Sequence, residues 1–109
     1  MNGGVTLTRR LRADHPAFAG HFPGQPLLPG VVLLSEVLEA VLADATLAAL
    51  VGARPVIASA KFLAPVSPVN DATIELVIAL QPQAGGLRFE VSRDAVTVAR
   101  GQFAAGVDA

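Results

Sequence analysis

The stretch from Val31 to Leu50 most constrains what this chain can fold into, because it is apolar on nearly every side of a helix. Gly52, just beyond it, is the residue type that favours the left-handed conformation at a helix C-terminus. At 100° per residue, Ser35, Glu39 and Thr46 fall within an arc of about 40°, and the opposite side is Val, Leu or Ala. The stretch therefore predicts one long helix that protein surrounds on most sides, with a narrow polar stripe.

The rest of the chain shows strand patterns. Val5–Leu11 alternates between apolar and polar residues, which is typical of a strand with one buried face. Four further strands are expected after the helix, at Pro55–Leu63, Thr73–Leu80, Gly85–Arg93 and Val96–Phe103. Breaks are expected at Ser67–Asp71, Gln81–Gln83 and Arg93–Asp94. Short breaks favour antiparallel neighbours, and the simplest way to bury the helix is an antiparallel sheet curled around it: a single α+β domain over residues 1–109.

Composition excludes several classes of function. The net charge of −1 argues against nucleic acid as the main partner, since phosphate binding needs a basic surface. The chain has no cysteine, which excludes disulfides and thiolate nucleophiles and suits a reducing cytoplasm. Two histidines without cysteine make a metal site unexpected.

The apolar character of the chain raises the question of a membrane. The most apolar stretch contains Ser35, Glu36, Glu39 and Asp44, which are too many polar residues for an isolated membrane span. No secretory signal is recognisable at the start of the sequence. With 52% hydrophobic residues, so small a domain is expected to bury part of its surface in a dimer or larger oligomer.

A constrained loop directly precedes the helix. His21–Gly30 contains three prolines and two glycines after a histidine. Proline fixes φ, and glycine lets other groups approach the backbone. The loop ends where the helix is expected to begin, so free backbone N–H groups are expected beside the His21 imidazole, which titrates near neutral pH. This combination indicates a functional site, whereas His15, in a turn before Pro16, is expected to have no direct role.

The loop carries a family resemblance. Gly20–Val31 resembles the signature of the (3R)-hydroxyacyl-acyl-carrier-protein dehydratases, which have the hot-dog fold. Lys61–Val66 resembles the strand and turn that follow the helix in that family, and Gly86–Glu90 and Arg100–Gly101 fit its last strands more loosely.

The resemblance implies a specific reaction. Family members wrap a sheet around a central helix, join two sheets edge to edge in a dimer, and place their active-site tunnels at the dimer interface. The substrate is a 3-hydroxyacyl thioester on an acyl carrier protein, and elimination of water gives the trans-2-enoyl thioester. The catalytic histidine falls on His21, and the glycine whose N–H polarises the thioester carbonyl falls on Gly30. The elimination needs no cofactor. Whether this chain takes its substrate from the carrier protein or from coenzyme A stays open.

Chemistry supports these assignments. Removal of the weakly acidic α-proton needs a base such as imidazole, and the enolate-like charge needs a preorganised donor such as an N–H at a helix N-terminus. An apolar lining would exclude water and hold the acyl chain. The expected lining residues are Phe22, Leu27, Leu28, Val31 and Leu34.

The chain departs from the family at the catalytic acid. The family uses a Glu or Asp fourteen residues after the histidine, from the partner subunit, and this chain has Ser35 there. A serine hydroxyl cannot deliver a proton as a carboxylic acid can. Glu39 lies one turn further along the same helix face, so we hypothesise that Glu39 replaces the acid, directly or through a water held by Ser35. Glu36 points about 100° away and is expected to be a solvated or ion-paired helix residue.

Two other functions stay open. The chain could be a catalytically impaired acyl-binding protein or the partner subunit of a heterodimer with a related dehydratase, or it could be a hot-dog thioesterase, because a fold does not decide among these activities. Arg9, Arg10 and Arg12 form the densest basic cluster of the sequence. They are interpreted as a solubilising surface or as a contact for an acidic carrier protein.

Overall fold

The computed structural model describes residues 4–12, 30–52, 55–66 and 73–105. They form strand β1 (Val5–Arg12), helices α1 (Gly30–Leu42) and α2 (Ala45–Val51), and strands β2 (Val56–Phe62), β3 (Thr73–Gln83), β4 (Gly86–Arg93) and β5 (Val96–Ala104). The expected turns at Asp14–Pro16 and Ser67–Asp71 lie outside the described residues.

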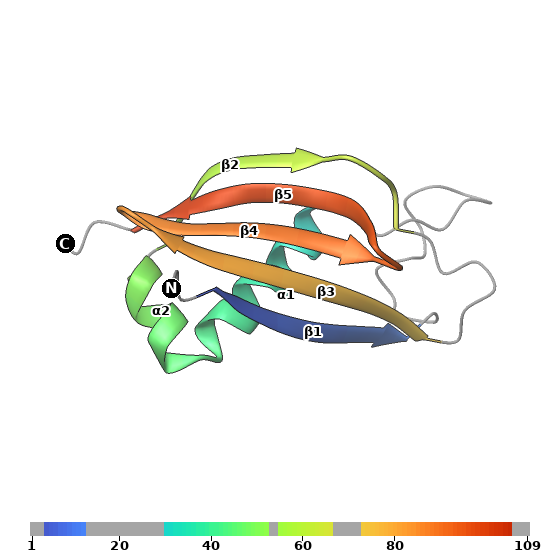
Figure 1. The fold of residues 1–109 in the computed structure, drawn as a ribbon, viewed down its shortest axis with the longest axis horizontal. Helices are drawn as coiled ribbons and strands as arrows, with labels where there is room; N and C mark the ends of the chain where they lie inside the picture. The colour runs from blue at the N-terminus through green and yellow to red at the C-terminus, as the bar shows by residue number, and fades with distance from the viewer. Residues whose placement is uncertain (1–3, 13–29, 53–54, 67–72, 106–109) are drawn as a thin grey trace.

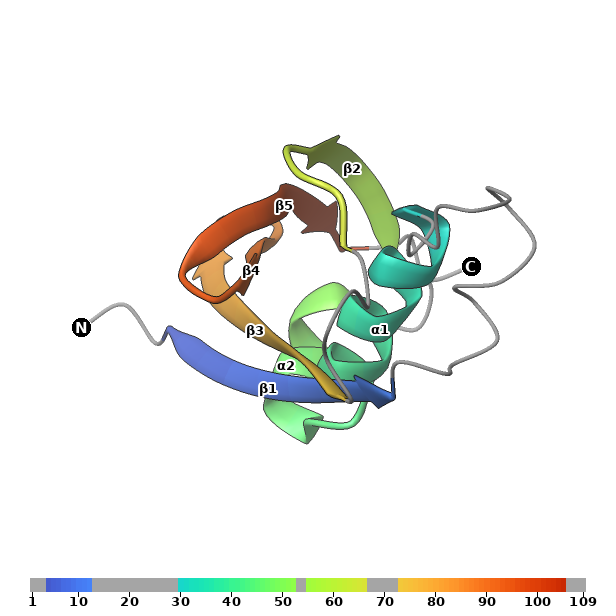
Figure 2. The same cartoon turned by 90° about the vertical axis from the view of Figure 1, so that its right-hand side faces the viewer.

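The five strands form one antiparallel sheet in the order β1-β3-β4-β5-β2. The sheet curls around α1, as the end-on view in Figure 2 shows. In both Figure 1 and Figure 2, α1 runs diagonally across the concave face, from the β2 side of the sheet at its first residues to β1 at its last. The predicted α+β architecture, an antiparallel sheet wrapped around a helix, is therefore confirmed.

Buried and exposed residues alternate along the strands, and the buried ones form the core. The buried residues of β3 are every second one, Ile74, Leu76, Ile78 and Leu80, and β4 continues the pattern with Leu87, Phe89 and Val91. The Phe89 and Phe103 rings lie 5.1 Å apart between their centroids. From the helices, the buried side chains that pack into the same cluster are Leu33, Val37, Ala40, Val41, Leu47 and Val51. The concave face is thus closed by α1 and α2 without any buried polar or charged side chain among the described residues.

The prediction of one long helix was wrong. The helix breaks at Ala43 and Asp44, because the Asp44 side chain caps a second helix: its Oδ1 accepts hydrogen bonds from the backbone N–H of Thr46 at 2.9 Å and of Leu47 at 3.1 Å. Thr46 therefore belongs to α2 and does not extend the polar stripe of α1. The helix ends were predicted correctly, since α1 begins at Gly30 and Gly52, with φ 76°, donates its N–H to the Ala48 carbonyl after α2.

The expected break at Gln81–Gln83 was also wrong, because β3 continues to Gln83 through Pro82. The reason lies in the sheet register. The β1 ladder reaches β3 only as far as the Val5–Leu80 pair, whereas β4 still pairs with Pro82 through Leu87. Proline cannot donate a ladder hydrogen bond, and it is tolerated where a strand has a neighbour on one side only. The turn follows instead at Ala84 and Gly85, where Gly85 has φ 78°.

Strand β2 is joined to β5 through an irregular and close contact. The β2–β5 register shifts between Ile57 and Ser59, which marks a β-bulge. A Cβ added at Gly101 of β5 would lie 2.2 Å from the Ser59 carbonyl oxygen and 2.7 Å from the Phe89 ring. Glycine at this position therefore allows β2 to pair closely with the sheet.

Candidate active site

The first residue of α1 lies against the end of β2. Gly30 has no intrahelical carbonyl partner for its N–H, because the first N–H groups of a helix lie beyond the reach of its own ladder. The Phe62 ring lies directly over the Gly30 Cα: a Cβ added there would be 2.7 Å from the Phe62 Cζ. The absence of a side chain at Gly30 thus allows an aromatic ring to stand next to the helix N-terminus.

A cavity of about 420 Å³ opens at this contact. The described residues that line it are Gly30, Leu33, Phe62, Leu63, Ala64, Pro65 and Val66. Its walls are apolar, and Phe62 and Leu63 are about half exposed, at 50% and 43%. An apolar cavity beside the N–H groups of a helix N-terminus can hold an acyl chain and place its carbonyl there.

The described residues that line this cavity differ from the lining that the sequence predicted. Gly30 was predicted as the donor of an N–H to the carbonyl, whereas Leu33 and Phe62 were not assigned roles. Phe62 could have been found, because it lies within Lys61–Val66, the second segment that carried the family resemblance. Leu34 is partly buried against the core and is not among the described residues that line the cavity.

His21, Phe22, Leu27 and Leu28 lie outside the described residues, and Val31 lies in the first turn of α1. The structure describes the chain again from Gly30, the residue that follows Pro29 in the sequence.

Ser35 lies on the side of α1 that faces away from the core. It is exposed, and so is Leu42, at 49%, two turns further along the same helix face. The buried side of the same helix is formed by Leu33, Val37 and Val41. The position where the family resemblance places an acid is therefore at the surface of this subunit.

The two glutamates of α1 are turned towards β1. The Arg9 Nε lies 3.4 Å from the Glu36 Oε1, and the Arg9 Nη2 lies 3.9 Å from the Glu39 Oε2. The Glu36 side chain is 14% exposed, whereas that of Glu39 is 62% exposed. Glu36 is thus the ion-paired helix residue that was expected.

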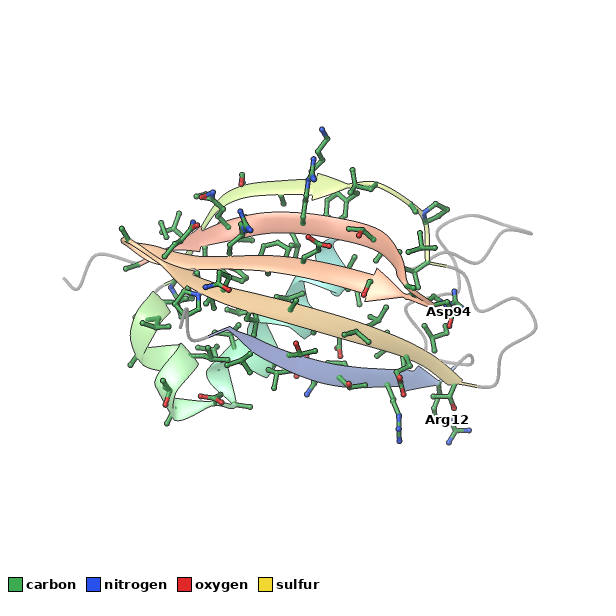
Figure 3. The ribbon with its side chains drawn as sticks, viewed as in Figure 1. Arg12 and Asp94 are labelled. Atoms are coloured by element: carbon green, nitrogen blue, oxygen red, sulfur yellow. The ribbon has the colours of Figure 1, made fainter. Side chains whose placement is uncertain are left out.

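The basic cluster of the sequence is split by the strand that carries it. Arg9 faces the helix, while Arg10 and Arg12 lie on the outer face of β1. The Arg10 Nε lies 3.1 Å from the Glu75 Oε2 on β3, so both Arg9 and Arg10 are paired with carboxylates of this chain. Figure 3 shows Arg12 at the end of the sheet where the β4–β5 turn presents Asp94.

Neither a metal site nor a membrane span is found within the part of the chain that the structure describes. There, no group of three or more His, Cys, Asp or Glu side chains could hold a metal ion. No helix in the described ranges is long and apolar enough to cross a membrane.

Comparison with known proteins finds relatives among the dehydratases. The 3-hydroxyacyl-acyl-carrier-protein dehydratase FabZ of Chlamydia trachomatis is 34% identical over 78% of this chain and 60% of its own length. The chain therefore spans about three-fifths of the length of the curated relatives that it matches first.

Solved structures show the same fold. The dehydratase heterocomplex ApeI:P from Xenorhabdus doucetiae matches with a TM-score of 0.63 and 28% identity, over 93% of this chain and 85% of that one. A bifunctional dehydratase-cyclase domain from ambruticin biosynthesis matches with a TM-score of 0.67 over 97% of this chain and 39% of that one, at 23% identity, which shows the fold alone. The family described as ApeI-like, ApeI dehydratase, matches residues 2–102. The chain therefore belongs to this family of hot-dog dehydratases.

Proposed function

We propose that this chain dehydrates a (3R)-hydroxyacyl thioester, carried by an acyl carrier protein, to the trans-2-enoyl thioester in cytoplasmic fatty-acid or related lipid or polyene biosynthesis. The observation that carries the proposal is the apolar cavity at the N-terminus of α1, where Gly30 offers its N–H beside Phe62. The family supports a dehydratase role, and in the sequence the segment with His21 directly precedes Gly30.

The proposed steps assign one role to each group. The His21 imidazole takes the proton from C2 of the acyl chain, and the electron pair of that C–H bond forms the C2–C3 double bond as the C3–O bond breaks. The Gly30 N–H, aligned with the α1 dipole, stabilises the negative charge on the thioester oxygen. The hydroxyl group leaves as water after it receives a proton from an acid.

We propose that the acid is Glu39 of a second subunit, acting directly or through a water held by Ser35. Ser35 is exposed on the outer side of α1, and Glu39 follows it by one turn. In this role the Glu39 side chain must exchange its contact with Arg9, 3.9 Å away, for the site of the neighbouring subunit.

The second subunit is expected at β2. This edge strand is exposed along its whole length, and its apolar side chains Val56 and Ile57 are 51% and 47% exposed. An exposed apolar edge strand is a template for pairing with another chain. Pairing of two β2 edges would join two sheets and cover the cavities that open beside Phe62.

A second candidate function is favoured by Ser35. If Glu39 does not supply the proton, this chain is the partner subunit of a heterodimer in which a related dehydratase contributes the carboxylate. A homodimer would then lack the acid in both sites, whereas a heterodimer would have one complete site. The match to the ApeI:P heterocomplex is in line with such an arrangement.

Hydration of a crotonyl thioester tests the proposal. Wild type is expected to hydrate the substrate, and His21→Ala is expected to lose roughly 100-fold or more of kcat, because general-base catalysis contributes about that much. Ser35→Glu, which restores the carboxylate of the family, is expected to raise kcat.

Three outcomes would contradict parts of the proposal. Equal rates for wild type and His21→Ala would refute the enzyme assignment. Full activity in Glu39→Gln would remove Glu39 as the acid. Release of free thiol from an acyl thioester, followed with a thiol reagent, would favour a thioesterase.

A further inference from the structure

The Phe62 side chain points to the concave side of the sheet at the place where β2 ends. It stands opposite Ala99 of β5, which is buried, and directly opposite residues of a ladder share one face. The end of its ring meets the first residue of α1: a Cβ on Gly30 would lie 2.7 Å from the Phe62 Cζ and 3.0 Å from both Cε atoms. The tip of the ring therefore rests against Gly30.

The backbone that carries this ring is held on both sides of Phe62. Before it, the ladder with β5 fixes the strand. After it, the Leu63 N–H donates a hydrogen bond to the Val98 carbonyl oxygen at 2.8 Å, and the Ala64 N–H donates to the same oxygen at 3.4 Å. The ring can therefore yield to a neighbouring group only by rotating its own side chain.

The rest of the ring is open to the cavity at the N-terminus of α1. Phe62 is half exposed and lies outside the buried core, and it lines the cavity together with Gly30. Among the described side chains, the Phe62 ring supplies the three atoms nearest to the position that a Gly30 Cβ would take. The ring is thus the wall of the cavity beside the Gly30 N–H.

The acyl carbon C2 would be bound close to this wall. In the proposed reaction the thioester oxygen accepts a hydrogen bond from the Gly30 N–H, at about 2.9 Å, so C2 lies within about 5 Å of the Gly30 nitrogen. The ring rests against the Cα that is bonded to this nitrogen. One hydrogen of C2 leaves in the elimination and the other stays. A branch at C2 would take the place of the hydrogen that stays.

We propose that Phe62 determines specificity: its ring fills the space beside C2 and restricts the site to acyl thioesters that are unbranched at this carbon. Gly30 has no side chain to occupy that space, so its filling depends on Phe62. A straight acyl chain carries only hydrogen at C2, whereas a methyl branch must displace the ring. An apolar pocket discriminates by one such carbon about 10- to 200-fold. The inference rests on the dehydratase function proposed above, and it names the class of acyl group that the site takes.

The test compares the hydration of crotonyl- and tiglyl-N-acetylcysteamine, which differ by one methyl group on C2. That methyl group slows the addition of water chemically, to the same extent in every variant, so a change in the ratio of the two kcat/KM values reports on the site. Phe62→Leu and Phe62→Ala remove increasing parts of the side chain. The crotonyl-to-tiglyl ratio is expected to fall in that order, by roughly tenfold for Phe62→Ala. A change in assembly or in the folded fraction would alter both rates alike and leave the ratio unchanged.

The control variant is Leu63→Ala, because Leu63 lines the same cavity and is exposed to a similar extent. It is expected to keep the wild-type ratio. Trans-2-octenoyl-N-acetylcysteamine, which is longer but unbranched, controls for a general loosening of the cavity, and its rate relative to crotonyl should change little in Phe62→Ala. An unchanged crotonyl-to-tiglyl ratio in Phe62→Ala, or an equal gain for the octenoyl and tiglyl thioesters, would overturn the proposal.

A wild type that hydrates none of these thioesters would refute the proposed reaction instead. The role of Phe62 is then decided by calorimetric titration with butyryl-coenzyme A and 2-methylbutyryl-coenzyme A, whose binding needs no turnover. Weaker binding of the branched thioester to wild type, together with equal binding of both thioesters to Phe62→Ala, supports the proposal. Equal binding of both to wild type, or the same discrimination in both proteins, overturns it.

Discussion

The sheet has two edge strands, β1 and β2, and α1 covers only β1. Its last turns lie against β1, where Arg9 pairs with Glu36 and where Leu11 is buried. At β2 the helix contributes only its first residues, and all seven residues of the strand are exposed. The chain covers one edge with its own helix and leaves the other for a partner, and the candidate site lies beside the uncovered edge.

The largest expected effect is at the attachment of β2. Gly101→Ala would place a Cβ 2.2 Å from the Ser59 carbonyl oxygen, which belongs to the backbone and cannot turn away as a side chain does. Overpacking of this kind is expected to lower the free energy of unfolding by about 3 kcal/mol. Chemical denaturation measures it. Gly30→Ala is the control, because its Cβ meets only the half-exposed Phe62 ring, and it should cost less. Equal losses for the two variants would contradict the close contact at β2.

The next largest expected effect is on self-association, which distinguishes the edge strand β2 from the edge strand β1. Ile57→Lys places a charge on the exposed β2 edge and is expected to weaken self-association by about 2 kcal/mol, roughly thirtyfold in Kd, as seen by analytical ultracentrifugation.

The matched variant on the other edge is Leu7→Lys, on the half-buried inner face of β1. It is expected to lower the free energy of unfolding while the association constant of the folded protein is kept. If both variants changed only stability, β2 would not be the interface.

The smallest effect concerns the ion pairs of the covered edge. Arg9→Met is expected to lower the free energy of unfolding by about 1 kcal/mol, because it removes the contact with the largely buried Glu36. Arg10→Met, whose pair with Glu75 is exposed, should cost only about 0.3 kcal/mol. A double-mutant cycle of Arg9→Met with Glu36→Gln isolates the pair, and a coupling energy near zero would show that β1 is held by packing alone.

Local patterns predicted most of the fold. The alternation in β1 and β3 and the glycines at the ends of the helical stretch marked the elements, because these signals depend on near neighbours in sequence. The helix break was missed because Asp44 was taken as a polar residue of a continuous helix, although aspartate is also a preferred N-cap. Pro82 was taken as a turn, because its tolerance in β3 depends on where β1 ends.

The positions of the charged side chains show more clearly what could not be predicted from the sequence. Arg9, Arg10 and Arg12 are adjacent in sequence, but the strand separates them onto two faces and two of them meet carboxylates. Lys61, Arg88 and Arg100 are far apart in sequence and meet through the register of three strands. Such a cluster follows from long-range pairing, which short patterns do not encode.

The β-bulge of β2 determines which side chains of this strand point to which face of the sheet. Ile57 and Phe62 are five residues apart, an odd spacing that in a regular strand would send them to opposite faces. They nevertheless stand opposite Phe103 and Ala99, which both face the core, because one extra residue near Ala58 shifts the phase of the strand. A gain or loss of a single residue at this place would exchange the faces of Lys61 and Phe62 relative to Ile57. The length of β2, as much as its composition, therefore keeps the Lys61 side chain on the outer face of the sheet and the Phe62 ring over α1.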